Sequence, residues 1–198
     1  MIKNIEGLPA KKLDSEAVQR GGNMDSYCVF CMTGSERNVV EQINSCFSSD
    51  VLKAVLPRKI VRQKRKKRIE RLETIIIPGY AFIYSNRYEE IININVKKIK
   101  GIYKLLTYGD GSQRLVGSDA AYAMWIYNNQ GLIDTSEVII AGSIVEVVSG
   151  PLTECIGKII WVDRKKSKAL VEFDFDGVER NILLEVNILK HIPNSKNI

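Results

Sequence analysis

The chain has 198 residues, 45% of them hydrophobic, which is enough to bury a core in each of one or two domains. It has no run of 18 apolar residues and no basic start followed by an apolar block, so we expect a cytoplasmic protein without a membrane span or secretory signal. The net charge of +6 is unevenly distributed: residues 58–71 hold nine Lys or Arg and one Glu, or +8, so the other residues sum to −2.

Residues 1–23 show weak hydrophobic periodicity and end in Gly21-Gly22, so we expect a disordered leader there. Residues 20–24 read Arg-Gly-Gly-Asn-Met, and the codons AGA-GGA-GGA-AAU-AUG for that peptide would also form a purine-rich ribosome-binding sequence ahead of an AUG. We therefore hypothesise that Met24 is the native initiator. The alternatives are a genuine N-terminal arm that folds on binding and a remnant of recombinant expression.

The periodic part of the chain begins after Met24. The stretch "SYCVFCM" predicts a strand from its β-branched and aromatic content, and Gly34-Ser35 then offers a turn and a helix N-cap. Apolar residues at helical spacing in "SERNVVEQINSCF" predict the helix that follows.

Residues 52–84 are predicted to form a long hairpin with a basic tip. "KAVLPRKIV" leads into the basic segment and "TIIIPGYAFIYS" returns from it as a strand. We expect a bulge or bend at Pro78-Gly79, because proline donates no ladder hydrogen bond and glycine weakens pairing. Residues 88–100 remain ambiguous, since Ile-Asn alternation favours a strand while length favours a helix.

The remaining pattern indicates a helix, a linker and a small barrel. "GIYKLLT" predicts a short strand, and Ser118-Asp119 cap a helix that Gly131 stops. Residues 129–138 carry no strong pattern and are predicted to be a linker. The next fifty residues contain five predicted strands separated by turn signals: "SIVEVV", "GKIIWVD", "KALVEFDF", "VERNILL" and "ILKHI".

Two of these motifs resemble one known family. "IIIPGYAFIYS" resembles the strand of NusG-type transcription factors in which an apolar residue precedes Pro-Gly-Tyr. "GSIVEVVSGPLTECIGKIIWVDRKKSKALVEF" resembles the KOW motif of the same family, and "YCVFCMTGSERNVVEQI" is similar to its first strand, loop and helix. The resemblance spans about residues 25–192.

The resemblance implies an α+β fold with two domains. Residues 24–128 would form the family's NGN domain, an α/β sandwich-like unit with an antiparallel sheet. Residues 129–138 would link it to a five-stranded SH3-like KOW barrel at 139–192, followed by a tail at 193–198. In the family the first domain binds the clamp helices of RNA polymerase, so the resemblance implies a polymerase-bound elongation and antitermination factor that acts as a monomer.

The chain departs from the housekeeping pattern of the family. The usual Phe-Gly-Arg near the last strands is replaced by "FDFDGVERNILL". "GPL", "VDRKKSKA" and "LEVNIL" look closer to LoaP-like paralogs, which act on particular long operons. The family's barrel contacts a ribosomal protein and a termination factor in housekeeping members and RNA in LoaP-like ones.

Motif position and alternation give the candidate polymerase-binding residues. Clamp helices need an apolar concavity that receives helix side chains. Tyr80 and Phe82 share one strand face, and for Phe82 both a core and an interface role remain open. The expected set is Tyr27, Phe30, Ile77, Tyr80 and Phe82.

Two basic elements are candidate contacts to RNA or DNA in the elongation complex. Dense positive charge binds nucleic acid through counterion release, although each element can also be an ordinary solvated turn. Residues 58–71 contain no aromatic side chain to stack on bases, so we expect phosphate contact without sequence readout there. The expected set is Arg58, Lys59, Arg62, Lys64, Arg65, Lys66, Lys67, Arg68, Arg164, Lys165, Lys166 and Lys168.

The sequence shows no catalytic set, and we expect neither an enzyme nor a cofactor. The single histidine, His191, and the Cys28-x-x-Cys31 pair have no partners at zinc-ligand spacing, so no metal site is predicted. The rival hypothesis is a ribosome- or RNA-associated KOW protein that never binds polymerase. A Pro-Gly-Tyr strand in a separate N-terminal domain favours the first reading.

Overall fold

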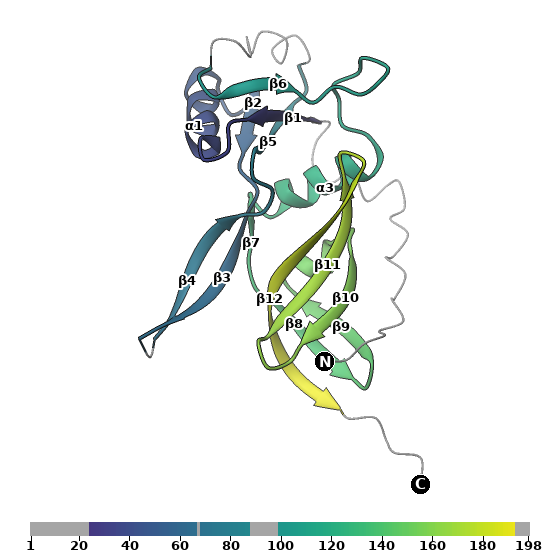
Figure 1. Ribbon diagram of the computed structural model, residues 1–198. Helices are drawn as coiled ribbons and strands as arrows, with labels where there is room; N and C mark the ends of the chain where they lie inside the picture. The colour runs from purple at the N-terminus through teal and green to yellow at the C-terminus, as the bar shows by residue number, and fades with distance from the viewer. Residues whose placement is uncertain (1–23, 67, 88–98, 193–198) are drawn as a thin grey trace. The chain divides into compact units, whose positions relative to one another are not determined.

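The computed structural model describes residues 24–66, 68–87 and 99–192, and these residues divide into two compact units (Figure 1). Of the described residues, one unit contains those within 24–58 and 75–131, and the other contains those within 59–74 and 132–192. Of the described helices, none is long and apolar enough to cross a membrane. The N-terminal predictions for 1–23, the ambiguous element at 88–98 and the tail at 193–198 lie outside the described residues.

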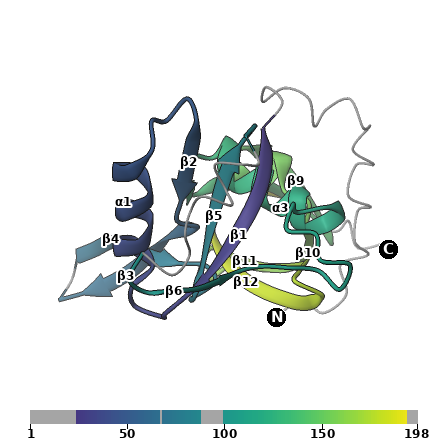
Figure 2. The same cartoon turned by 90° about the horizontal axis from the view of Figure 1, so that it is seen from above.

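The first unit is built on a four-stranded antiparallel sheet with the order β2-β5-β1-β6. Its strands are β1 (Asp25–Cys31), β2 (Leu52–Val55), β5 (Tyr80–Ser85) and β6 (Ile102–Leu105), and its helices are α1 (Glu36–Cys46) and α3 (Gly117–Asn128). The two helices cover opposite faces of the sheet (Figure 2). The strands predicted from "SYCVFCM" and "GIYKLLT" and the first helix are therefore present, whereas "KAVLPRKIV" is divided into two strands, β2 and a separate strand at Arg58–Arg65.

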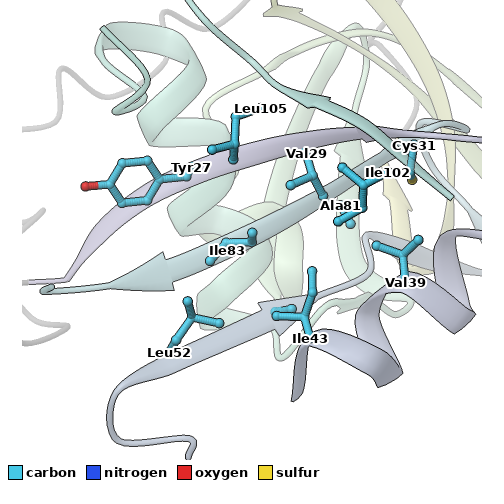
Figure 3. Packing of buried hydrophobic residues seen from close by; sticks show 11 residues of the cluster. Tyr27, Val29, Cys31, Val39, Ile43, Leu52, Ala81, Ile83, Ile102 and Leu105 are labelled. Atoms are coloured by element: carbon cyan, nitrogen blue, oxygen red, sulfur yellow. The ribbon is translucent and has the colours of Figure 1, made fainter. Parts of the chain in front are cut away.

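Side chains of β1 and β5 point alternately to the two faces of the sheet, and each face packs against one helix. Tyr27, Val29, Ala81 and Ile83 pack with Val39 and Ile43 of α1 in one buried cluster (Figure 3). On the other face, the phenol of Tyr84 donates a 2.6 Å hydrogen bond to the carbonyl of Ala123 in α3. Because successive side chains of a strand point to opposite faces, one run of apolar residues serves two helices.

The predicted helix caps are not made as expected. Ser35 is the N-cap of α1 but makes no side-chain capping bond, and Val116 rather than Ser118 is the N-cap of α3. Asp119, in the first turn of α3, is buried and accepts a 2.7 Å hydrogen bond from the hydroxyl of Tyr108. An acidic side chain there suits the positive end of the helix dipole.

The second unit combines a three-stranded sheet with a curled five-stranded sheet. The three-stranded sheet has the order β4-β3-β7, from β3 (Arg58–Arg65), β4 (Arg68–Ile75) and β7 (Leu132–Ile133). The five-stranded sheet has the order β10-β11-β12-β8-β9 and curls into a half-barrel (Figure 1). Its strands are β8 (Ser136–Ala141), β9 (Ile144–Ser149), β10 (Lys158–Asp163), β11 (Lys168–Phe175) and β12 (Val178–Ile192).

Five strands were expected in this sheet, but the segments that form them differ from the prediction. The last two predicted strands are one continuous strand, β12, which pairs antiparallel with β11 through its first part and parallel with β8 through its second. The fifth strand is β8, which begins inside the segment predicted as a linker.

The Gly-Pro-Leu motif forms a turn of 3-10 helix at Pro151–Glu154 that packs on the start of β8. Gly150 has a φ of +88°, and a Cβ there would lie 2.8 Å from the Cα of Ser136. The Leu152 amide donates a 3.0 Å hydrogen bond to the Ser136 hydroxyl. Only glycine fits this close approach, which explains its place in the motif.

Candidate polymerase- and nucleic-acid-binding surfaces

An exposed aromatic surface lies across strands β5, β1 and β6 of the first unit. Phe30 and Tyr80 are cross-strand partners, and their rings meet edge to face with centroids 5.2 Å apart. The ring of Tyr103 lies 5.9 Å from that of Phe30 and is 61% exposed. We call Phe30, Tyr80 and Tyr103 the aromatic surface; it offers rigid apolar rings with two polar tips, as protein interfaces commonly do.

The bend before β5 is fixed by one buried carboxylate. Glu36, the first residue of α1, is 1% exposed and accepts hydrogen bonds from the amides of Gly34, at 2.7 Å, and Gly79, at 2.8 Å. The Gly79 carbonyl in turn accepts a 2.8 Å hydrogen bond from the amide of Cys31. These bonds hold the end of β1 against the start of β5 and so set the pairing of Phe30 with Tyr80.

Gly79 itself sits where another residue would be strained. Its φ is +85°, and a Cβ there would lie 3.4 Å from the Cys31 carbonyl oxygen and 3.7 Å from the Phe30 ring. Each residue of the Pro-Gly-Tyr sequence therefore has its own role. The proline donates no hydrogen bond to the sheet, the glycine adopts the conformation of the turn, and the tyrosine lies in the aromatic surface.

The structure separates the five predicted polymerase-binding residues into two groups. Phe30 and Tyr80 are partly exposed and lie together in the aromatic surface. Tyr27, Ile77 and Phe82 are at most 3% exposed and belong to the core. Tyr27 packs in the cluster beneath α1, and the Phe82 ring lies against Tyr122 of α3, because both sheet faces are covered at those positions.

Two residues of this region were not singled out from the sequence. Tyr103 belongs to a short strand whose partner, β1, is about 70 residues away, so sequence alone does not place it beside Phe30. A tyrosine in a short predicted strand was the available signal. For Glu36 the available signal was only its position, an acidic residue at the start of a helix.

The described cations at the tip of the basic hairpin are exposed. Lys64, Arg65, Lys66 and Arg68 are all exposed, and Arg65 lies 3.7 Å from Glu70. We call these four cations the hairpin tip. Lys67 lies outside the described residues. Toward the other end of β4, Arg71 makes two 2.7 Å hydrogen bonds to the carboxylate of Asp134.

The base of the hairpin uses its cations internally. Arg58 and Lys59 are half-buried, and the Lys59 ammonium donates a 2.9 Å hydrogen bond to the carbonyl of Leu183. Burial lowers the pKa of Lys59 below its ordinary value; the nearby Lys168 lowers it further, and Glu185 opposes the change. Lys59 therefore uses at least one of its donors within the protein.

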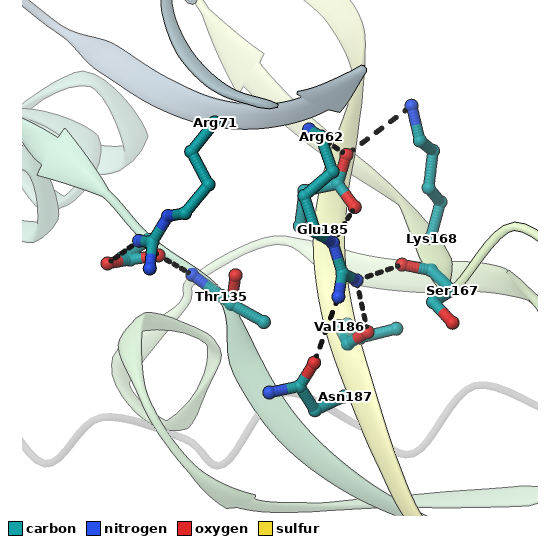
Figure 4. A network of polar contacts seen from close by, with 9 residues as sticks. Arg62, Arg71, Thr135, Ser167, Lys168, Glu185, Val186 and Asn187 are labelled. Atoms are coloured by element: carbon teal, nitrogen blue, oxygen red, sulfur yellow. Dashed lines mark hydrogen bonds and ion pairs between the residues drawn. The ribbon is translucent and has the colours of Figure 1, made fainter. Parts of the chain in front are cut away.

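Arg62 makes the most extensive polar contacts of the hairpin (Figure 4). Its amide and its Nε donate 2.9 Å hydrogen bonds to the two carboxylate oxygens of Glu185. Its Nη2 donates to the carbonyls of Ser167, at 3.3 Å, and Val186, at 2.8 Å, and its Nη1 donates to Asn187 at 3.1 Å. Together these bonds fix the guanidinium plane.

Glu185 receives a second cation from the other predicted basic element. The carboxylate is 3% exposed and lies 3.4 Å from the Lys168 ammonium. A buried carboxylate requires such pairing, because desolvating an unpaired charge is costly. We call Arg62, Ser167, Lys168 and Glu185 the joint.

The turn between β10 and β11 presents the remaining cations. Arg164, Lys165 and Lys166 are exposed, and we call them the β10–β11 turn. The amides of Lys165 and Lys166 donate hydrogen bonds of 2.9 and 3.0 Å to Asp163. These bonds lower the pKa of the Asp163 carboxyl, the one from Lys166 most, and they hold the turn in shape.

Within the described ranges, no three His, Cys, Asp or Glu side chains gather closely enough to hold a metal ion. Cys28 and Cys31 are buried thiols that are not joined in a disulfide. Burial, assisted by Glu36, raises the pKa of Cys31 to about 11.

Residues 24–120 match the family model described as transcription termination factor NusG. Among solved structures, the chain is similar to one titled "Domain interaction in Thermotoga maritima NusG", with a TM-score of 0.51 and 18% sequence identity. The match covers 82% of this chain and 93% of that chain, and at this identity it shows a shared fold. No curated protein matches the chain.

Proposed function

Residues 24–120 of this chain belong to the NusG family of transcription factors, and on that premise we propose that the protein binds RNA polymerase through the aromatic surface. The observation that carries the proposal is the set of three neighbouring aromatic rings, in which Glu36 and Gly79 set the pairing of Phe30 with Tyr80. Such rings suit the side chains of an amphipathic helix, and the polymerase clamp helices are the expected partner. The activity is binding and not catalysis.

The consequence of binding would be processive elongation. A factor that holds the clamp and contacts nearby nucleic acid favours continued synthesis over termination. We propose antitermination on particular operons, since the C-terminal sequence resembles LoaP-like paralogs, with the half-barrel contacting RNA or a protein partner. A cytoplasmic location and a monomeric state are consistent with this role.

The test is the affinity of the full chain for core RNA polymerase. Phe30→Ala and Tyr103→Ala should each weaken binding by about 1–3 kcal/mol, the range for an aromatic residue at the centre of an interface. Ile144→Ala, which removes a side chain 57% exposed on β9, is the matched control and should bind as the wild type does.

Thermal melting of each variant separates lost contact from lost folding. Normal melting together with unchanged polymerase affinity in both aromatic variants would contradict the proposed surface. Complete absence of polymerase binding by the wild type would instead favour the rival function, an RNA-associated protein that never meets polymerase.

A further inference from the structure

Two basic segments about 100 residues apart in sequence are joined within one unit of the structure. The hairpin strand β3 carries the first, and the turn between β10 and β11 carries the second. Arg62 of the first contacts the Ser167 carbonyl at the end of the second, and Glu185 pairs with a cation from each. We propose that the hairpin tip and the β10–β11 turn form one composite site for the phosphate backbone of a double-helical nucleic acid.

The joint fixes the spacing of the two cationic groups. Lys64 lies two residues beyond Arg62 in β3, where strand geometry places it about 7 Å away, and Lys66 follows in the turn after the strand. Lys165 and Lys166 are at most two residues from Ser167, which Arg62 contacts directly. The two groups therefore lie within about 20 Å of one another, a span of about six phosphates along one strand of a duplex.

The joint also determines which cations remain for a ligand. Arg62 and Lys168 are both paired with the buried Glu185, so we assign these residues the role of connecting the two segments and assign phosphate binding to the others. The exposed cations on either side are the seven of the hairpin tip and the β10–β11 turn. Glu70 beside Arg65 and the turn-forming Asp163 are the acidic groups that face them.

The chemistry of these residues favours a duplex over a single strand. Neither segment contains an aromatic side chain, so unpaired bases have nothing to stack on. Two separated groups of flexible cations instead fit a rigid backbone that reaches both at once, as a folded RNA stem or a DNA duplex does. Binding to both groups of one rigid ligand raises affinity through effective concentration.

This proposal deepens the nucleic-acid contact of the proposed function, and it is tested on the protein without polymerase so that each can fail separately. The measurement is fluorescence anisotropy of the full chain with a 20-base-pair RNA stem-loop, a DNA duplex of equal length and a matched single strand. Tight binding of either duplex supports the site and identifies the source of the backbone. Equal affinity for the single strand would overturn it.

Two joint variants separate geometry from charge. Arg62→Lys keeps the positive charge but cannot make the several hydrogen bonds of the guanidinium. Glu185→Gln removes the shared carboxylate and raises the net charge by one. Loss of the fixed spacing should weaken duplex binding roughly tenfold in both. Glu179→Gln makes the same charge change at an exposed position of β12 and should bind at least as tightly as the wild type. Unchanged or tighter binding by both joint variants would overturn the composite site.

Two double variants change the cationic groups and leave the joint intact, so they test the composite site even if the joint variants unfold. The double variants Lys64→Gln/Lys66→Gln and Lys165→Gln/Lys166→Gln should each lower the log–log salt slope of binding by about 1.8, with one duplex bound per chain. Independent sites would give two duplexes per chain, or a turn variant with wild-type affinity, and either result contradicts the proposal.

Discussion

A single carboxylate organises the region around the aromatic surface. Glu36 is nearly inaccessible, yet it accepts from the amides on both sides of the contact between β1 and the Pro78-Gly79 bend. The Gly79 amide is buried and would have no such acceptor without Glu36, at a cost comparable to a lost hydrogen bond, whereas Gly34 is exposed. The position of Tyr80 therefore depends on a residue 44 places earlier in the chain.

Glu36→Gln tests this dependence. A glutamine amide offers one acceptor oxygen where the carboxylate offers two, so one backbone amide would face an NH₂ group. We expect a loss of about 1–3 kcal/mol in the free energy of unfolding, measured by urea denaturation of the full chain. Glu41→Gln, at an exposed position of the same helix, is the control and should be neutral. Equal midpoints for the two variants would contradict the role of Glu36.

The cysteines give a second test at the scale of residues. Cys46 is exposed, Cys28 and Cys31 are buried, and Cys155 is half-buried with its pKa raised by burial to about 11. A thiol with that pKa is about one-thousandth thiolate at pH 8, so alkylation of the folded chain should add one label, at Cys46. Mass spectrometry should show no label on Cys46→Ser at pH 8, with reaction at Cys155 emerging as the pH rises toward 11. Rapid labelling of Cys155 at pH 8 would contradict the described burial.

At the scale of elements, the bend before β5 depends on glycine. Gly79→Ala would place a Cβ at a φ of +85° and 3.4 Å from the Cys31 carbonyl oxygen. We expect a loss of about 1–2 kcal/mol, the cost of the left-handed conformation for a residue with a side chain. Gly109→Ala is the matched control, since its Cβ would meet nothing within 4 Å. A thermal melt in which both variants behave alike would show that the bend tolerates a side chain.

Local patterns predicted the elements better than their partners. Alternation identified β1 and β5, and helical spacing identified α1, because each signal lies within a dozen residues. The parallel pairing of β12 with β8 joins segments about 50 residues apart, and nothing in "ILKHI" distinguishes a new strand from the continuation of β12. For the same reason Tyr103 could not be placed beside Phe30, nor Arg62 beside Glu185.

The structure separates exposed candidate site residues from buried ones, which amino-acid composition cannot do. Charge density predicted that 58–71 would be basic and solvated, which holds at the hairpin tip. It could not show that Arg62 and Lys168 share one buried carboxylate, because Glu185 lies more than 100 residues from Arg62 in sequence. Likewise, motif position favoured Phe82 and Ile77 as contacts, while the packing against them places both in the core.

At the scale of the whole molecule, the chain presents two different surfaces on two units. The aromatic surface belongs to the unit that contains residues 75–131, and the cationic residues of the hairpin tip belong to the unit that contains residues 132–198. We expect the first surface to be insensitive to salt, because it is apolar, and the second to lose affinity steeply with salt. Under the proposed function, polymerase and nucleic acid would therefore be bound by separate surfaces with different salt dependence.

The central claim is that the aromatic surface contacts RNA polymerase, and site-specific photo-cross-linking tests it most directly. A photoreactive phenylalanine replaces Tyr103 in the full chain, and a second protein carries the same residue at the exposed position of Ile144 on β9. After irradiation with core polymerase, the account predicts a cross-link from position 103 to a helical segment of the clamp and none there from position 144. A protein that binds polymerase but cross-links to the clamp only from position 144, or from neither position, would contradict it.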